Sequence, residues 1–385
     1  MKPEIVVGIP TYREVDSIAY VVRQVDIGLS RAYGARNCLI VNVDNESDDG
    51  TGDVFLNTRT ACSKEYISTG CNPRGKGKNL LKLLNMSLDI GAKHIMTIDA
   101  DIVTVGTKWA SQLLDPIIND DIDYTTPIYT RNRFEGSTTN HFAFPLIYGV
   151  YGTFVRQPIG GEFGISQKFA KYLVKQEIIP TTEQYGIDMF ITSHAVGGKF
   201  RIKEIPLGRK MHKPSFPKII PIFTQEAHTG LHLARHYWRQ IDELVPVNIM
   251  DTFQNGIDFE QRPPSVDSVA SLLTQAKEDF LANSEWKQDV LGTIYDEVKN
   301  ILMLGSPRIT SELWARFLAA CVYKVVQEDY VAEHLSSMVD IIRSVFLWRT
   351  ATLWDVAHMM STAQVEREIR HQAEAFRREL SLLQP

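Results

Sequence analysis

The stretch Ile95-Met96-Thr97-Ile98-Asp99-Ala100-Asp101 decides the fold class. An apolar, β-branched run of strand length ends in two carboxylates separated by one residue, which is typical of a buried parallel strand. Ligands of open α/β sheets bind beyond the carboxyl ends of the strands. Because side chains at i and i+2 of a strand point the same way, we expect Asp99 and Asp101 to face one ligand.

Two carboxylates this close repel each other unless a cation lies between them, and oxygen-rich sites suit Mg²⁺ or Mn²⁺. The sequence therefore predicts a divalent-cation site at Asp99 and Asp101. The pattern also fits a simpler arrangement, in which one aspartate caps the next helix and the other is solvated.

Strand-like and helix-like segments alternate around this stretch. Apolar runs at 5–9, 38–44 and 65–68 read as strands, and amphipathic runs at 17–29 and 76–89 read as helices. This alternation predicts an α/β fold with a mainly parallel, Rossmann-like sheet. Beyond residue 220 helical periodicity dominates, near 225–243, 266–282, 286–303, 310–327, 330–346 and 363–382, with breaks at 261–264 and 305–307. We therefore expect an α/β domain at 1–220 and an all-helical C-terminal region at 221–385.

Composition excludes several classes of function. The 385 residues are 44% hydrophobic and 23% charged, with a net charge of −5, which gives no support for a nucleic-acid partner. The four cysteines are scattered without a C-x-x-C pair, which indicates free thiols in a reducing compartment. The N-terminus does not resemble a signal peptide, and no apolar run is long enough to span a bilayer, so we expect a cytoplasmic protein.

Two other segments carry chemistry suited to a nucleotide. Asp44 ends a predicted strand, where an acid can bind a nucleobase or ribose, although it can equally cap the turn that follows. The segment 74–78, Arg-Gly-Lys-Gly-Lys, combines glycines, exposed N–H groups, three cations and a helix N-terminus, which favours a diphosphate. It lacks the spacing of a P-loop, and a solvated basic turn is the alternative.

Several motifs occur in the order found in nucleotide-sugar glycosyltransferases with the GT-A fold. They are Pro10-Thr11-Tyr12-Arg13-Glu14, Asp44-Asn45-Glu46-Ser47-Asp48-Asp49-Gly50-Thr51, Gly75-Lys76-Gly77 and Asp99-Ala100-Asp101. Further motifs resemble mannosylglycerate synthases and the related glucosyl- and mannosyl-3-phosphoglycerate synthases, which are retaining enzymes. These are Gly106, Trp109, Gln157-Pro158-Ile159-Gly160-Gly161-Glu162, Tyr185-Gly186-Ile187-Asp188 and Met211-His212. The resemblance covers roughly residues 3–215, and the Gln-x-x-Arg-Trp signature of inverting relatives is not found in the sequence.

The resemblance implies roles for individual residues. The donor nucleotide and sugar would be bound by Pro10, Tyr12, Glu14, Asp44, Lys76, Asp99 and Gly161. The Mg²⁺ or Mn²⁺ ion would be held by Asp101 and His212, with Asp99 beside it. A histidine before Lys-Pro is otherwise most often a surface residue, so the assignment of His212 rests on the resemblance.

The segment 157–162 and Asp188 are the catalytic candidates. Gly160 and Gly161 let the backbone approach a ligand, and Gln157 and Glu162 offer polar groups to sugar hydroxyls, although a tight turn with a helix cap explains the same residues. Asp188 begins a buried helical run and can be a simple cap. The resemblance instead places it beside the donor sugar and the acceptor.

The acceptor candidates lie in the loop at 129–139. Two arginine forks, Arg131 and Arg133, stand near the hydroxyls of Thr138 and Thr139 and suit a small carboxylate or a phosphate. A solvated basic loop has the same composition. The resemblance implies glycerate or 3-phosphoglycerate as acceptor, and a helical C-terminal region that encloses the acceptor or forms a homodimer.

Together these features predict a metal-dependent retaining hexosyltransferase that uses a nucleoside diphosphate sugar, with mannose or glucose as the hexose. Two alternatives remain open. One is an inverting GT-A transferase that acts on a lipid phosphate or polysaccharide with Asp188 as general base. The other is a non-catalytic nucleotide-sugar-binding protein.

Overall fold

The computed structural model describes residues 2–212, 218–238, 265–282, 284–306, 308–327 and 329–383. These residues divide into two compact units. The first contains residues up to 130 together with those from 157 to 212, and the second contains 131–156 together with the described residues from 218 onward. The prediction of a boundary near 220 is therefore incomplete, because 131–156 was expected in the α/β domain and packs instead with the helices.

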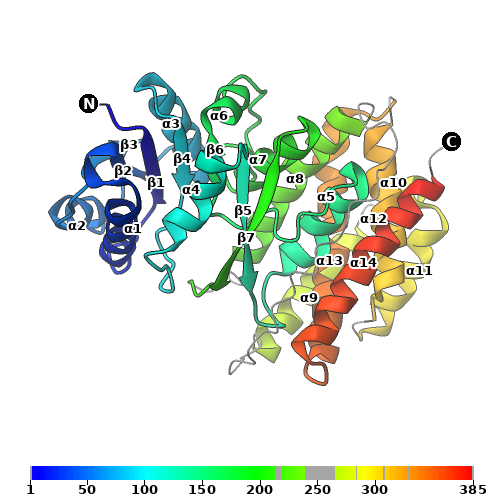
Figure 1. Cartoon of the computed structure of the whole chain (residues 1–385). Coiled ribbons are helices and arrows are strands. Elements are labelled where there is room, and N and C mark those ends of the chain that lie inside the picture. The colour runs from blue at the N-terminus through cyan, green and yellow to red at the C-terminus, as the bar shows by residue number, and fades with distance from the viewer. Residues whose placement is uncertain are drawn as a thin grey trace. The chain divides into compact units, whose positions relative to one another are not determined.

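The first unit is built on a seven-stranded sheet with the order β3-β2-β1-β4-β6-β5-β7 (Figure 1). The strands are β1 (Ile5–Thr11), β2 (Cys38–Asp44), β3 (Ser63–Ser68), β4 (His94–Thr97), β5 (Tyr124–Thr130), β6 (Gly164–Ser166) and β7 (Ile202–Arg209). Only β6 runs antiparallel to its neighbours. The carboxyl ends of the other strands thus share one edge, which confirms the mainly parallel sheet.

Helices cover both faces of this sheet. The helices are α1 (Ile18–Tyr33), α2 (Thr51–Asn57), α3 (Lys76–Asp89), α4 (Trp109–Asn119), α6 (Gln167–Leu173) and α7 (Ile187–Gly197). Val7 and Ile9 of β1 belong to an apolar core formed with α1 and α4. Gly8 points to the opposite face, where a Cβ atom would lie 2.1 Å from Leu83 of α3. Because side chains alternate along β1, one face of the strand contacts α1 and α4 and the other contacts α3.

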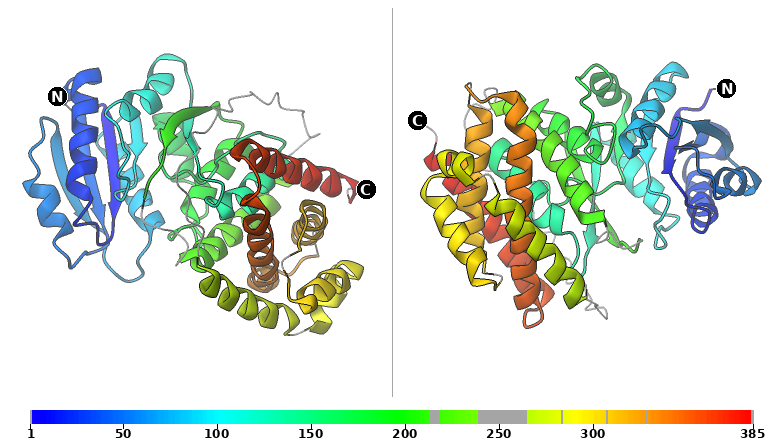
Figure 2. Two further views of the ribbon diagram at one scale, coloured as in Figure 1. Left: turned by 90° about the horizontal axis from the view of Figure 1, so that it is seen from below. Right: turned by 180° about the vertical axis from the view of Figure 1, so that it is seen from behind.

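The second unit is helical (Figure 2). It contains a short π-helix (Thr139–Ala143), α5 (Phe144–Tyr151), α8 (Ile219–Tyr237), α9 (Val266–Leu281), α10 (Ser284–Leu291), α11 (Thr293–Leu304), α12 (Ser311–Val326), α13 (Leu335–Ala357) and α14 (Thr362–Leu382). The helix predicted at 286–303 is divided, because Gly292 adopts a positive φ of 57° between α10 and α11. The predicted break at 261–264 and positions 239–243 of the first predicted helix lie outside the described residues.

Apolar packing explains why 131–156 belongs to the helical unit. Phe134 and Phe144 share a buried cluster with Leu353 of α13 and Ile369 of α14. Gly149 of α5 lies so close to α14 that a Cβ atom there would come within 2.2 Å of the Phe376 ring. In the described part of the chain, no helix is long and apolar enough to cross a membrane.

A buried arginine links three segments of this unit. The Arg349 guanidinium donates to Gln372 Oε1 at 2.7 Å, to Ser311 Oγ at 2.7 Å and to the Ile309 carbonyl at 3.1 Å. It also forms an ion pair with Glu368 at 3.1 Å. Because the arginine side chain is only 2% exposed, each of these acceptors compensates for lost hydration.

We expect Arg349→Met to destabilise the protein by about 3 kcal/mol or more, because it leaves buried acceptors unpaired. Urea denaturation measures the change. The matched control is Arg316→Met, which removes an ion pair with Glu297 whose two side chains are 40% and 44% exposed. The control should cost less than about 1 kcal/mol. Equal losses in the two variants would contradict the structural role of Arg349.

Candidate active site

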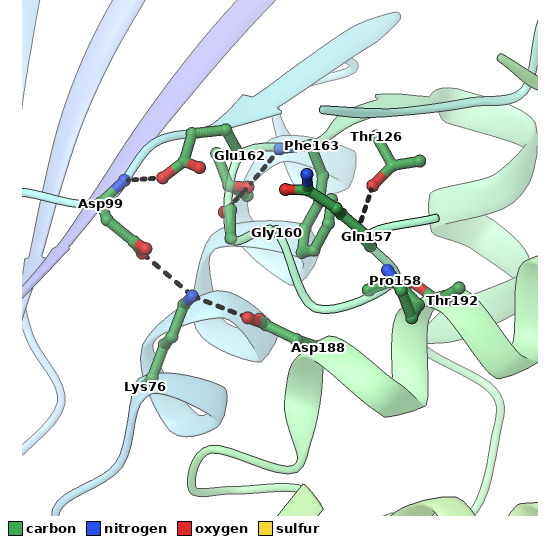
Figure 3. A network of polar contacts seen from close by, with 12 residues as sticks. Lys76, Asp99, Thr126, Gln157, Pro158, Gly160, Glu162, Phe163, Asp188 and Thr192 are labelled. Carbon is green, nitrogen blue, oxygen red and sulfur yellow. Dashed lines mark hydrogen bonds and ion pairs between the residues drawn. The ribbon is translucent and has the colours of Figure 1, made fainter. Parts of the chain in front are cut away.

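The ammonium group of Lys76 lies between two carboxylates (Figure 3). Its Nζ atom is 2.9 Å from Asp99 Oδ1 and 3.1 Å from Asp188 Oδ2. Lys76 is the first residue of α3, Asp99 follows the end of β4 by two residues, and Asp188 lies in the first turn of α7. The three side chains are 14%, 23% and 9% exposed, so the group is largely shielded from water.

A second ammonium group extends the network. Lys210, directly after β7, has its Nζ atom 2.9 Å from Glu162 Oε2 and 3.4 Å from Asp99 Oδ2. It also donates to the Gly160 carbonyl at 2.8 Å. Glu162, which is fully buried, accepts further hydrogen bonds from the Tyr129 hydroxyl and from the Asp99 N–H at 3.3 Å. Three carboxylates and two ammonium groups thus form one connected cluster.

Burial and charge act against each other in this cluster. Burial disfavours the ammonium form of Lys76, but the carboxylates of Asp188 and Asp99 hold its pKa well above the ordinary value. Burial would raise the pKa of Asp99, but Lys76 and Lys210 outweigh it and lower that pKa. Burial raises the pKa of Glu162 to about 7 despite Lys210, and it raises the pKa of Asp188 despite Lys76. Shifted pKa values are common among the residues of active sites, so this cluster is a candidate active site.

Gly161 lets the backbone approach the ion pairs. Its φ is +93°, and a Cβ atom there would lie 2.4 Å from Asp99 Oδ2 and 3.2 Å from Lys76 Nζ. The hydroxyl of Thr97 fixes this segment to β4 by donating to the Gly161 carbonyl at 3.1 Å and accepting from the Phe163 N–H at 3.0 Å. A side chain at position 161 would therefore displace the charged groups.

Gln157 is engaged within the sheet unit. Its side-chain amide donates to the Tyr129 carbonyl at 2.8 Å. The backbone carbonyl of Gln157 accepts from the Thr126 hydroxyl at 3.3 Å (Figure 3). The next residue, Pro158, accepts from Thr192 of α7 at 2.6 Å. These contacts hold the start of the 157–162 segment in place. A contact between Gln157 and a donor sugar stays a prediction.

The segment 74–78 differs from the expected phosphate cradle. The N–H groups of Gly77 and Lys78 donate to the carbonyls of Gln184 and Glu183 at 2.9 and 2.8 Å, and the Gly75 N–H donates to Asn45 at 3.1 Å. These amides are paired within the fold and are not exposed, so the expectation of free N–H groups is wrong for them. A Cβ atom at Gly75 or Gly77 would lie within 2 Å of a backbone carbonyl oxygen, which explains both glycines. The cation of Lys76 is the part of the motif that faces the site.

Asp44 holds the turn that follows β2. Its carboxylate is fully buried and accepts from the hydroxyls of Thr11 at 2.6 Å, Ser47 at 2.7 Å and Tyr66 at 3.0 Å, and from the Ser47 N–H at 2.7 Å. Four donors occupy its acceptor positions. It caps no helix, because α2 begins at Thr51 after Gly50, and direct contact with a base stays a prediction.

Half-buried side chains lie at the carboxyl end of β1, where the sequence predicts a base pocket. Pro10, Tyr12 and Glu14 are all half-buried. The Arg74 guanidinium lies over the Tyr12 ring, 4.2 Å from its centroid. The Glu14 carboxylate accepts from the Ser17 hydroxyl at 3.0 Å. Binding of a base by these residues stays a prediction.

The segments that carry Asp101 and His212 run side by side. The Val103 N–H donates to the Met211 carbonyl at 2.9 Å, and the Met211 N–H donates to Thr104 Oγ1 at 3.0 Å. Among the described residues, no group of three or more His, Cys, Asp and Glu side chains is arranged to hold a metal. Asp99 is instead paired with two lysines. A carboxylate and an imidazole are suitable donors for Mn²⁺, so Asp101 and His212 are of a suitable chemical type, and their binding of a cation stays a prediction.

The predicted acceptor residues belong to the second unit. Arg133 donates to the Met360 carbonyl at 2.6 Å and lies over the Phe134 ring, 5.5 Å from its centroid. Thr138 and Thr139 are buried, with 8% and 3% exposure. Arg131 and these three residues thus belong to the second unit, whereas the cluster around Lys76 belongs to the first. Their contact with an acceptor stays a prediction.

Two members of the cluster were not predicted from the sequence. Lys210 stands between a strand and His212, where a lysine reads as an ordinary solvated charge. Tyr129 was expected in the acceptor loop at 129–139 and not beside Glu162. The signal for Lys210 is its place at the carboxyl end of a strand that lies parallel to β5, two residues before a candidate metal ligand.

No model of a protein family matches the sequence, and no curated protein matches it. Among solved structures, the chain is similar to glucosyl-3-phosphoglycerate synthase from Mycobacterium tuberculosis. Its complex with Mn²⁺, UDP and phosphoglyceric acid is 19% identical with a TM-score of 0.49, covering 60% of this chain and 78% of that chain. Its complex with Mn²⁺, UDP-glucose and phosphoglyceric acid has the same identity and TM-score, with 60% and 80% covered. The complex with Mg²⁺ and UDP is 19% identical with a TM-score of 0.48, covering 60% and 79%.

The pKa of Glu162 predicts a pH effect on stability. The ordinary value is 4.5 and the folded value is about 7, so the folded state holds the proton more tightly than the unfolded state. This contribution is fully present below about pH 4.5 and is lost as pH rises through about 7. Relative to wild type, Glu162→Gln should therefore gain stability with rising pH, by up to about 1.4 kcal/mol per pH unit within that window.

Urea denaturation of both proteins at pH values from 4.5 to 8 measures the difference in slope. Glu65→Gln, on the exposed face of β3, is the control and should follow the wild-type profile. Parallel profiles for wild type and Glu162→Gln would show that Glu162 titrates normally.

Proposed function

We propose that this chain is a cation-dependent GT-A glycosyltransferase. It transfers a hexose, mannose or glucose, from a nucleoside diphosphate sugar to a small polar acceptor, with glycerate or 3-phosphoglycerate favoured. The observation that carries the proposal is the buried group of Lys76, Asp99 and Asp188 at the carboxyl edge of a parallel sheet. This edge is where α/β proteins bind nucleotides, and the group supplies both signs of charge that such a transfer needs.

The donor would be held by its diphosphate and its base. The Lys76 ammonium is the cation of the 74–78 segment that belongs to the cluster, and charge-assisted contacts to phosphate oxygens are strong. The Tyr12 ring and Arg74 offer a stacking surface for the base. Asp101 and His212 would hold the Mg²⁺ or Mn²⁺ ion, which when bound neutralises charge on the leaving diphosphate.

Asp188 would stabilise the transition state. Positive charge develops at the anomeric carbon as the diphosphate leaves, and a buried carboxylate stabilises it more strongly than an exposed one. Asp99 and Glu162 are both held by ammonium groups, so neither is presented as a nucleophile. We therefore favour attack by the acceptor from the face that the diphosphate leaves, with retention of configuration.

An inverting transfer is the second candidate. It is favoured by two features of Asp188: burial raises its pKa, and its Oδ1 atom is buried and has no hydrogen-bond partner among the residues that the structure describes. A carboxylate with a raised pKa is better matched to removing a proton from an acceptor hydroxyl. Under this alternative Asp188 would be the general base, and the product would have the opposite anomeric configuration.

The decisive experiment is an activity screen. UDP-glucose, GDP-glucose and GDP-mannose are each incubated with glycerate or 3-phosphoglycerate in the presence of Mg²⁺ or Mn²⁺, and NMR determines the anomeric configuration of the product. An α-configured product from these α-configured donors supports retention, and a β-configured product supports inversion. Donor binding without any product would instead support a non-catalytic binding protein.

Donor binding should depend on the cation. Calorimetric titration with UDP and GDP, with Mg²⁺ or Mn²⁺ and then with EDTA, should show affinity falling at least about tenfold when the cation is removed, because uncompensated phosphate charge meets the carboxylates. In Asp101→Asn this cation dependence should shrink. Asp115→Asn, in α4, is the control and should bind as wild type does. Equal affinity with and without the cation would contradict the assignment of Asp101 and His212.

Asp188→Asn separates catalysis from a purely structural role. The capping alternative is wrong for Asp188, because the N-cap of α7 is Gly186 and no side chain caps that end. If Asp188 only held Lys76 within the fold, Asn would leave turnover near normal. If the charge stabilises the transition state, turnover should fall by roughly two orders of magnitude or more while the fold survives. Paired measurement of turnover and thermal melting tests this. Near-normal turnover would remove Asp188 from the catalytic residues.

A further inference from the structure

The two aspartates held by Lys76 differ in what else they contact. Asp99 also pairs with Lys210, whose Nζ atom is 3.4 Å from its Oδ2 atom. For Asp188, Lys76 is the sole hydrogen-bond and ion-pair partner of the side chain within the described residues. The other oxygen of Asp188, Oδ1, is buried and forms no hydrogen bond in this part of the chain. Removal of Lys76 would therefore leave Asp99 neutralised and Asp188 unpaired.

We propose that Asp188 competes with the donor's diphosphate for the ammonium group of Lys76, so that the Lys76–Asp188 ion pair is an autoinhibitory contact. This inference rests on the proposed function and concerns the regulation of the same site. Without a donor, the pair neutralises Asp188. When a diphosphate binds, Lys76 turns toward the phosphate oxygens and releases the carboxylate.

The consequence is a carboxylate that is activated by the substrate. A buried, unpaired carboxylate is unfavourable in the ground state, so part of the donor's binding free energy is used to separate the pair. The same carboxylate is then available when positive charge develops at the anomeric carbon. The ion pair thus weakens donor binding, because the donor must displace Asp188 from Lys76. It favours the transition state, because the charge of Asp188 is compensated by Lys76 only while no donor is bound.

The proposal predicts that a variant with a damaged catalytic group binds nucleotide more tightly than wild type. In Asp188→Asn the side chain keeps its shape but no longer holds Lys76 by charge. UDP and GDP, each with Mg²⁺, should bind about fivefold to tenfold more tightly, as expected when a competing charge-assisted contact is removed. Calorimetry measures the dissociation constants directly, with no need for turnover.

Asp123→Asn is the matched control. Asp123 is also a buried acid held by a lysine, with its Oδ2 atom 3.0 Å from Lys168 Nζ, but it directly precedes β5 at the amino end of that strand and forms no ion pair with Lys76 among the described residues. The nucleotide affinity of this variant should stay within about twofold of wild type, because a distant charge has a smaller effect than a direct contact. A gain in both variants would overturn the proposal, since it would reflect only the loss of negative charge.

A double-mutant cycle completes the test. In a Lys76→Met background, Asp188→Asn should produce no gain in nucleotide affinity, because there is no ammonium group left to release. Thermal melting of each variant confirms that it is folded, and Lys76→Gln replaces Lys76→Met if the latter is not. Unchanged or weaker binding by Asp188→Asn would overturn the proposal while leaving the glycosyltransferase function intact. A wild-type protein that binds neither nucleotide with Mg²⁺ or Mn²⁺ would overturn both.

Discussion

The sheet unit depends on one ammonium group placed between two carboxylates. Lys76 is the first residue of one helix, Asp99 follows a strand, and Asp188 lies in the first turn of another helix. The contact therefore exists only where these three separate elements meet. The backbone is shaped to allow this. Gly77 can approach the Thr182 carbonyl because it lacks a side chain, and Gly161 brings the 157–162 segment against Asp99 for the same reason. A buried charge that is held by a partner costs far less than one left unpaired, so the group is tolerated in the fold only as long as its members stay together.

The α/β architecture could be predicted from the sequence because the strands β1, β2 and β4 are apolar runs of distinctive length. Their carboxyl ends share one edge in any parallel sheet, so the neighbourhood of Lys76, Asp99 and Asp188 followed from the motif order and the resemblance. The chemistry of each residue followed less well. Asp99 looked like a cation ligand, but two lysines hold it, and one of them, Lys210, is marked in the sequence only by its place between a strand and His212.

Other differences have a common physical cause. Backbone amides at 75–78 looked available because glycines and lysines suggest an exposed turn, yet Gln184 and Glu183 accept from the Gly77 and Lys78 amides, and the Asn45 side chain accepts from that of Gly75. Asp44 looked like a ligand contact, yet hydroxyl groups from β1, β3 and the following turn satisfy it. In each case some of the deciding partners are distant in sequence, such as Thr11 and Tyr66 for Asp44, and local pattern carries no information about them.

The path of the chain between the units has a consequence for protein engineering. The chain leaves the sheet unit after Thr130, passes through α5 in the helical unit, and returns at Gln157 before completing the sheet with β6 and β7. A fragment ending near residue 220 would keep this excursion but lose α13 and α14, leaving Phe134 and Phe144 without the side chains they pack against. Such a fragment would expose the apolar side chains of this excursion to water and would be prone to aggregate. Domain dissection of this protein would therefore call for excising the excursion and bridging its two ends with a short linker, and not for simple truncation.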